Sequence, residues 1–211
     1  LEENSSSEIL LSLNESGKRE EYEVVIDTTN KDKHQLNREI NSAYVRGATT
    51  LILKGKGLKN NSVTLKKILH NLMGLEIMEQ DYSKIVAKDL LAIDNISIEN
   101  IIRKISLITQ SMMEDLRKVP YNRSSSKNLY SRDEEVNRLT FLILRIVKSC
   151  FKNPSLAKKV GMNNEELFKT WKTVDVFEEI ADEAKRISRL MVDTNMEELR
   201  SAKFFEVYDE I

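Results

Sequence analysis

The first third of the chain alternates between short apolar runs and helical patterns. Residues 22–27 form a compact run rich in valine and isoleucine, which is typical of a buried strand. A second apolar run at residues 49–54 has the same character, and Gly47 just before it can end a helix. Between the two runs, one helical stripe is formed by Leu36, Ile40, Ala43 and Tyr44. This order predicts a strand, a helix and a second strand.

The pattern continues with another helix and two more strands. The next helical stripe ends before Gly74 and consists of Leu65, Ile68, Leu69 and Leu72. Residues 75–79 and 84–88 then read as two strands, separated by a short polar turn of the hairpin kind. Together these elements predict a β-α-β-α-β-β unit over roughly residues 20 to 90.

From Ile98 onward the apolar positions recur only at helical spacing. The first long helix is expected to end at Pro120, and residues 121–128 read as a polar connection. A second helix is expected to begin near Ser131 and to end at Asn153-Pro154. Its core stripe is predicted to comprise Val136, Leu139, Leu142, Ile143, Ile146 and Cys150.

A third long helix is predicted for residues 164–193, and a last amphipathic stretch runs from Met196 to Ile211. The core stripe of the third helix is expected to contain Leu167, Trp171, Val174, Phe177, Ala181, Ala184 and Ile187. The predicted fold class is therefore α+β, a small β-α-β-α-β-β domain followed by an antiparallel helical bundle. We expect an N-terminal tail or domain remnant at residues 1–20, the α+β domain at 21–95 and the helical domain at 96–211.

Composition narrows the class of protein only a little. The 33 basic residues nearly balance the 34 acidic ones, so no overall charge favours nucleic acid or anionic lipid. A single cysteine, Cys150, excludes an intrachain disulfide and favours a buried thiol in a reducing, cytoplasmic setting. The most apolar stretch, residues 139–147, is too short to span a bilayer. The chain starts without methionine, which suggests a missing upstream segment.

Two acidic segments carry the chemistry that stands out. In the second predicted long helix, Asp133 and Asn137 are four residues apart and enclose Glu134 and Glu135. In the third, the corresponding pair is formed by Glu178 and Asp182. Side chains four residues apart share a helix face at about 6 Å, so two facing helices could surround a hard cation. Carboxylates favour magnesium or manganese, or iron where they can bridge, rather than zinc.

The alternative reading is that these acidic residues are ordinary solvated helix faces. Acidic pairs at this spacing are common in a chain with 32% charged residues. Asp133 and Glu134 would also lie near the start of a helix that begins at Ser131, where they would complement the helix dipole. Glu178 and Asp182, however, lie beside an apolar stripe, where an uncompensated acidic pair is costly.

Residues 177–187 and 132–139 resemble the acidic motifs on the third and second helices of a repeat in the phosphate-uptake regulators called PhoU. Segments 43–48, 72–77 and 89–91 resemble the linking α+β domain of archaeal PhoU-like proteins. The resemblance covers roughly residues 20 to 190. A full PhoU domain holds two three-helix repeats, whereas this chain holds one and a fragment, which suggests a metal site that is weakened, incomplete or completed by another subunit.

The resemblance implies a non-enzymatic, cytoplasmic regulator of phosphate uptake that acts by protein contact. The implied partners are the phosphate-transporter ATPase, a sensor kinase, or both, and a homo-oligomer such as a dimer is expected. It also implies a metal site, for iron, manganese or magnesium, at Asp133, Glu134, Asn137, Glu178 and Asp182. Two positions depart from the family pattern: Asn137 stands where aspartate is usual, and Glu183 replaces a common histidine.

Two further classes of function stay open at this point. Related proteins often carry an AbrB-type DNA-binding domain upstream, so the chain could belong to a transcriptional regulator whose DNA-binding part is absent here. Alternatively, the carboxylates could serve metal-assisted hydrolysis. The acidic segments lack a histidine, lysine or serine set in a recognisable catalytic role, which favours the regulator.

Overall fold

A computed structural model describes residues 2–3, 9–10 and 21–193. The first two of these segments are the short strands β1 (Glu2–Glu3) and β2 (Ile9–Leu10), which pair antiparallel. Most of the expected N-terminal tail and the amphipathic stretch from Met196 to Ile211 lie outside the described residues. The two domains lie within residues 21–193.

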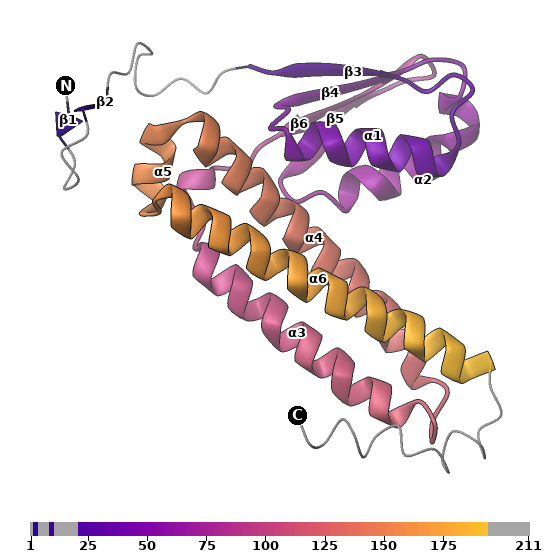
Figure 1. The fold of residues 1–211 in the computed structure, drawn as a ribbon. Coiled ribbons are helices and arrows are strands. Elements are labelled where there is room, and N and C mark those ends of the chain that lie inside the picture. The colour runs from indigo at the N-terminus through magenta and orange to yellow at the C-terminus, as the bar shows by residue number, and fades with distance from the viewer. Residues whose placement is uncertain (1, 4–8, 11–20, 194–211) are drawn as a thin grey trace.

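The α+β domain has the predicted order of elements (Figure 1). Its sheet is ordered β3-β4-β6-β5, with β3 parallel to β4 and the other neighbours antiparallel. Helices α1 and α2 pack on one face of this sheet. The elements are β3 (Glu23–Asp27), α1 (Lys33–Val45), β4 (Thr50–Lys54), α2 (Leu58–His70), β5 (Leu75–Gln80) and β6 (Lys84–Asp89).

Local sequence explains where α1 begins and which face it buries. The Asp32 carboxylate accepts hydrogen bonds from the backbone N–H groups of His34, at 2.7 Å, and Gln35, at 2.9 Å. The Gln35 side chain accepts in return from the Asp32 N–H, which completes a capping box. The predicted stripe of α1 is fully buried against the sheet, and the α2 stripe is buried in the same core.

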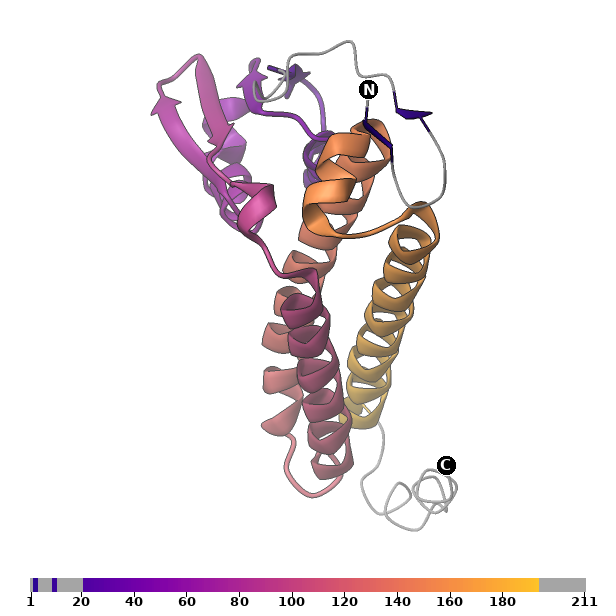
Figure 2. The same ribbon diagram turned by 90° about the vertical axis from the view of Figure 1, so that its left-hand side faces the viewer.

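The second domain is a bundle of three long helices that lie side by side (Figure 2). Within the described residues, no helix is both long enough and apolar enough to cross a membrane. Cys150 lies in the bundle core, as predicted, and burial raises the pKa of its thiol to about 11. The elements are the short 3-10 helix η1 (Ile93–Asn95), α3 (Ile98–Lys118), α4 (Ser125–Lys152), α5 (Pro154–Val160) and α6 (Asn164–Asp193).

One predicted helix boundary was wrong, and one short helix was not predicted. Helix α4 begins at Ser125, not near Ser131, because the Asn122 side chain turns the chain by accepting from the N–H and hydroxyl of Ser124. The short helix α5 was not predicted at all. It starts where the Asn153 side chain accepts from the Leu156 N–H, with proline in its first turn.

The predicted stripe of α6 is correct except at Trp171, which is 38% exposed. Thr170 occupies the buried position on that turn instead, and Ser188 does the same further along the helix. Phe177 and Ile187 are partly buried against the core, while Leu167, Val174, Ala181 and Ala184 are buried. The error arose because helical spacing placed Trp171 in one stripe with Leu167 and Val174, although the buried face of α6 passes through the small polar residues Thr170 and Ser188.

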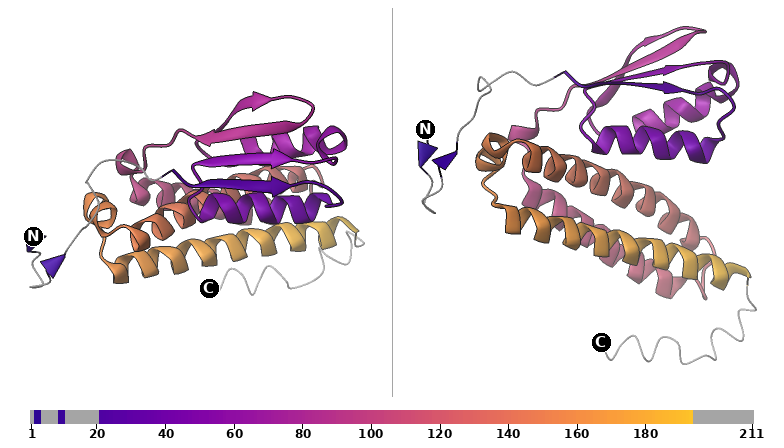
Figure 3. Two further views of the ribbon diagram at one scale, coloured as in Figure 1. Left: turned by 90° about the horizontal axis from the view of Figure 1, so that it is seen from above. Right: turned by 45° about the horizontal axis from the view of Figure 1, so that its top comes forward.

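The two domains meet along α4, which lies beneath α1 in the view of Figure 3 (right). Phe141 and Leu144 of α4 pack against the core of the α+β domain. Arg145 is only 1% exposed and donates to the carbonyl oxygens of Tyr44 and Ala48, the latter at 2.9 Å. The same guanidinium forms an ion pair with the buried carboxylate of Asp89. A buried charged group therefore holds the helical domain against the end of α1 and the end of β6.

Gly57 illustrates how closely α2 approaches the end of β3. A Cβ at this position would lie 2.2 Å from the carbonyl oxygen of Thr28, although its φ of −73° suits any residue. We expect Gly57→Ala to lower the free energy of unfolding by about 2 kcal/mol, because backbone must move to admit the methyl group. Gly161→Ala is the comparison. Gly161 has a φ of +74°, and a Cβ at this position would have no neighbouring atom within 4 Å.

Backbone strain alone should cost about 1 kcal/mol at Gly161. Urea denaturation of the two variants beside the wild type measures both free energies. A loss at Gly57 that is no larger than the loss at Gly161 would contradict the steric explanation.

Candidate carboxylate site between helices α4 and α6

The acidic segments of α4 and α6 meet at a lysine. Lys185 of α6 donates to Asp133 of α4 at 2.7 Å and to Asp182, one turn away on its own helix, at 2.6 Å. Asp133 is only 5% exposed, and it also accepts a hydrogen bond from the Asn137 amide at 3.3 Å. The two predicted pairs, four residues apart on each helix, therefore face one another across the α4–α6 contact.

Glu178 completes the cluster without a partner of its own. It is half-buried, and no hydrogen bond or ion pair joins its carboxylate to another described residue. Burial raises the pKa of Glu178, and the negative charges of Asp182 and Asp133 raise it further. The cluster therefore has one more carboxylate than its single lysine bridges.

The lysine is held in its charged form by the acids around it. Burial lowers the pKa of Lys185, but its hydrogen bonds to Asp133 and Asp182 outweigh that effect and leave the pKa above its usual range. Burial also raises the pKa of Asp133, and the bond to Lys185 opposes this shift. The Lys185 ammonium thus acts as the cation of the site.

Sequence reasoning identified the acids but missed this lysine. The residue lies three positions after Asp182, where a helix brings it to the same face, and that spacing was the signal available. The motif was read for its oxygen ligands alone. A basic residue at that spacing competes directly with any metal ion for the same carboxylates.

Glu134 lies apart from the cluster. Its carboxylate points to Lys67 of α2, at 2.9 Å, so it links the two domains at their surface. Glu135 pairs with Lys104 of α3, and Glu183 pairs with Arg186. The structure therefore brings together Asp133, Asn137, Glu178 and Asp182 of the predicted set, and it places Glu134 on a different face of α4.

The helix-dipole explanation for Asp133 does not apply. Helix α4 begins at Ser125, so Asp133 lies more than two turns inside it, beyond the first turn over which the dipole acts. Its burial against α6 also contradicts the reading of a solvated face. The position of Asp133 requires a compensating charge, and Lys185 supplies one.

The side chains as placed are set for an ammonium ion rather than a metal. Among the described residues, no group of three or more histidine, cysteine, aspartate or glutamate side chains is arranged to hold a metal ion. The donors suit a hard divalent cation in their chemistry, since they are carboxylates and an amide. A metal ion would have to enter where the Lys185 ammonium now lies between Asp133 and Asp182.

Glu178→Gln should stabilise the protein at neutral pH more than at acidic pH. Because the pKa of Glu178 is raised in the folded state, the folded protein binds more protons than the unfolded chain. The free energy of unfolding therefore falls as the pH rises above 4.5, the ordinary pKa of a glutamate. Glutamine removes this unfavourable charge. Below that pH the carboxyl is protonated in both states, and the variant should lose its advantage. Thermal unfolding from pH 4 to pH 8 measures the difference.

Glu179→Gln is the matched control, because Glu179 is exposed on the neighbouring position of α6. It should shift the melting temperature little at any pH. If Glu178→Gln changed stability equally at pH 4 and pH 8, the charge of Glu178 would not be the cause.

Comparison with known proteins gives one match. The family model described as the PhoU domain matches residues 102–191, which is less than half of the 211 residues. The matched region contains most of α3, all of α4 and α5, and most of α6, so it includes every residue of the carboxylate cluster. Neither the comparison with curated proteins nor the comparison with solved structures gave a match.

Proposed function

We propose that this protein regulates phosphate uptake through contact with other proteins, because residues 102–191 match the family model described as the PhoU domain. At the level of the family, the PhoU domain indicates regulation of phosphate uptake rather than catalysis. The observation that carries the proposal is the extent of this match, which takes in the three long helices that form the bundle core. The phosphate-transporter ATPase, a sensor kinase, or both are the proposed partners.

The outer face of α6 supports a role in protein contact. Phe168, Val176 and Ile180 are 55%, 48% and 38% exposed, and their spacing places them within one third of the helix circumference. This face is opposite the stripe that packs into the bundle. On this face the apolar side chains alternate with exposed charged ones such as Lys172 and Glu179, a mixture typical of protein contacts that form and dissociate.

The proposal is tested by deleting the gene in its native host. Phosphate uptake and phosphate-responsive transcription should change, and the wild-type gene should restore both. Val176→Asp/Ile180→Asp should fold but fail to restore them, because two charges on the α6 face oppose partner binding. Val63→Asp is the control, since Val63 is 81% exposed on α2, away from this face. Deletion that leaves uptake and transcription unchanged would refute the regulatory proposal.

Direct binding distinguishes the partners. The purified protein should be retained by the phosphate-transporter ATPase, by the sensor kinase, or by both, and the α6 double variant should be retained less. Retention of neither the wild type nor the variant by either partner would contradict a contact of this kind.

We also propose that the cluster accepts a divalent cation of magnesium, manganese or iron when Lys185 moves aside. Asp133, Glu178 and Asp182 would supply carboxylates, and the Asn137 amide could supply a fourth oxygen. The unpartnered Glu178 supports this, because it leaves negative charge in excess at a half-buried position. Elemental content of the purified protein should exceed that of Glu178→Gln/Asp182→Asn. Equal content, or none in either protein, would refute a site at these residues.

A further inference from the structure

Strand β3 is an edge strand with free hydrogen-bonding groups. It pairs only with β4 in its sheet. The Tyr22 carbonyl accepts from the Thr49 N–H at 2.8 Å, and the Thr28 N–H donates to the Lys54 carbonyl at 2.7 Å. Successive residues of a strand direct their backbone N–H and C=O groups to alternate sides. The N–H and C=O groups of Glu23, Val25 and Asp27 therefore point away from β4. No backbone hydrogen bond outside the sheet engages these groups among the described residues.

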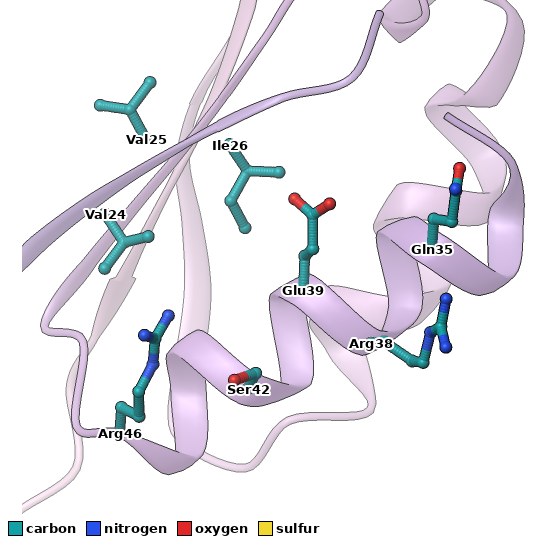
Figure 4. A pocket seen from close by; sticks show the side chains of 8 residues that line it. All are labelled: Val24, Val25, Ile26, Gln35, Arg38, Glu39, Ser42 and Arg46. Atoms are coloured by element: carbon teal, nitrogen blue, oxygen red, sulfur yellow. The ribbon is translucent and has the colours of Figure 1, made fainter. Parts of the chain in front are cut away.

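A pocket of about 460 Å³ lies between this edge and α1 (Figure 4). One wall is β3, from Val24 to Ile26. The other wall is the face of α1 that carries Arg38, Ser42 and Arg46. An edge strand flanked by a helix in this way is the arrangement by which several domain families bind an extended peptide as an added strand.

The pocket is positively charged. No hydrogen bond or ion pair within 4 Å engages the side chain of Arg38 or Arg46 among the described residues. The acid of the same wall, Glu39, is paired with Lys31 at 2.6 Å, so it does not neutralise the arginines. The two guanidinium groups are therefore available to carboxylates that enter the pocket.

We propose that this edge binds an extended peptide with two acidic residues four positions apart, which adds as a strand to β3. Arg38 and Arg46 are eight residues apart on α1, which corresponds to about 12 Å along the helix. Four residues of a strand span about 13 Å, and residues that differ by an even number point to the same side. The peptide would thus carry an acid, an apolar residue and a second acid at alternate positions. The two acids would reach Arg38 and Arg46, and the apolar residue would lie between them against β3. The inference does not depend on the phosphate function.

A second copy of this chain fits the edge less well than such a peptide. Antiparallel pairing of two β3 strands about Val25 would place Glu23 of one copy opposite Asp27 of the other, at both ends. Like charges directly opposite one another destabilise a strand pair. The two arginines would also gain no acid from the apolar centre of a second β3.

Fluorescence anisotropy with labelled peptides tests the proposal on the full chain. The probe is Thr-Glu-Thr-Val-Thr-Glu-Thr, and it should bind with saturation. Two comparison peptides should bind about tenfold more weakly or not at all. One carries lysine in place of both glutamates, and the other has the glutamates three positions apart, which places them on opposite sides of a strand.

Two variants locate the binding. Arg38→Gln/Arg46→Gln should weaken binding of the probe about tenfold or more, while Arg103→Gln/Arg189→Gln, which removes two exposed arginines of the bundle, should leave it unchanged. Val25→Pro should also weaken it, because proline removes an outward N–H that β4 does not use. Amide NMR shifts on peptide addition should concentrate at Glu23, Val25 and Asp27.

Three results would overturn the proposal. The first is no saturable binding below about 1 mM peptide, a very weak affinity. The second is equal binding by the wild type and Arg38→Gln/Arg46→Gln. The third is a concentration-dependent dimer, seen by sedimentation, that Val25→Pro abolishes, because the edge would then pair with a second copy.

Discussion

Arg145→Met is expected to lower the free energy of unfolding by about 3–5 kcal/mol, which is the usual cost of removing one member of a buried ion pair. Methionine fills much of the space of the arginine stem but leaves the Asp89 carboxylate buried without its cation. The carbonyl oxygens of Tyr44 and Ala48 lose their guanidinium donor in the same substitution. The cost therefore comes from polar groups in the α+β domain, although the substitution is in the helical domain.

Chemical denaturation of four proteins separates the pair from its surroundings. Asp89→Asn should also destabilise the protein, and Arg145→Met/Asp89→Asn should cost less than the two single losses added together. Lys152→Met is the matched control, since Lys152 donates to the Arg46 carbonyl at 2.9 Å on the same interface but is exposed. Its expected cost is below about 1 kcal/mol. Similar losses for Arg145→Met and Lys152→Met would contradict the role of burial.

Lys185→Met is expected to make the stability of the protein depend on divalent metal. Without the ammonium group, Asp133, Glu178 and Asp182 repel one another across the α4–α6 contact. In a chelating buffer the variant should therefore be less stable than the wild type. With Mn²⁺ at a hundred times its dissociation constant, binding should stabilise the variant by about 2.7 kcal/mol. The wild type should gain less, because the metal ion must first displace the lysine.

Melting temperatures with and without Mn²⁺ measure this difference. Lys185→Met/Glu178→Gln/Asp182→Asn should show no response to the metal, since two of the three carboxylates are gone. Arg186→Met is the control for loss of a cation on α6, because Arg186 pairs with Glu183 away from the cluster. A metal response of equal size in the wild type and Lys185→Met would show that the lysine does not compete for the site.

The fold followed from the sequence wherever a pattern is local. The stripe of α1 and the inward positions of β3 and β4 depend on residues within a few positions of one another, and Ile26, Leu51 and Leu53 are buried as expected. The prediction of a buried strand at residues 22–27 was wrong in part, because β3 lies at the edge of the sheet and Val25 is 54% exposed. The start of α4 was missed because serine and asparagine side chains usually favour turns, yet here the turn in which Asn122 accepts from the Ser124 N–H leads directly into the helix. Trp171 was misplaced because it lies four residues after Leu167 at helical spacing, whereas the buried position on that turn is the polar Thr170.

The acidic residues of the site could be predicted from the sequence, but the partner of each acid could not. Spacing placed Asp133 beside Asn137 and Glu178 beside Asp182, and the bundle brings these pairs together. Glu134 is adjacent to Asp133, but one position along a helix turns a side chain by about 100°, which directs it to Lys67 of the other domain. Which face of α4 meets α6 depends on tertiary packing, and one sequence does not contain that information in a local form.

The buried ion pair of Arg145 was not predicted from the sequence. In the sequence it only interrupts the apolar stretch at residues 139–147. Its partners Tyr44, Ala48 and Asp89 lie 101, 97 and 56 residues away along the chain, so no local pattern predicts the contacts. A lone basic residue within an apolar helical stripe is a signal of a buried charge pair, but the sequence does not identify the partner.

The contact between the two domains around Arg145 makes the helical domain a poor candidate for production on its own. Cutting the chain between residues 95 and 96 would separate two sequence domains, yet it would strip Phe141, Leu144 and Arg145 of the surface that covers them. The isolated bundle would expose an apolar, positively charged surface to solvent. The isolated α+β domain would keep Asp89 without the arginine that pairs with it. Each domain therefore covers apolar and charged groups that the other would expose on its own.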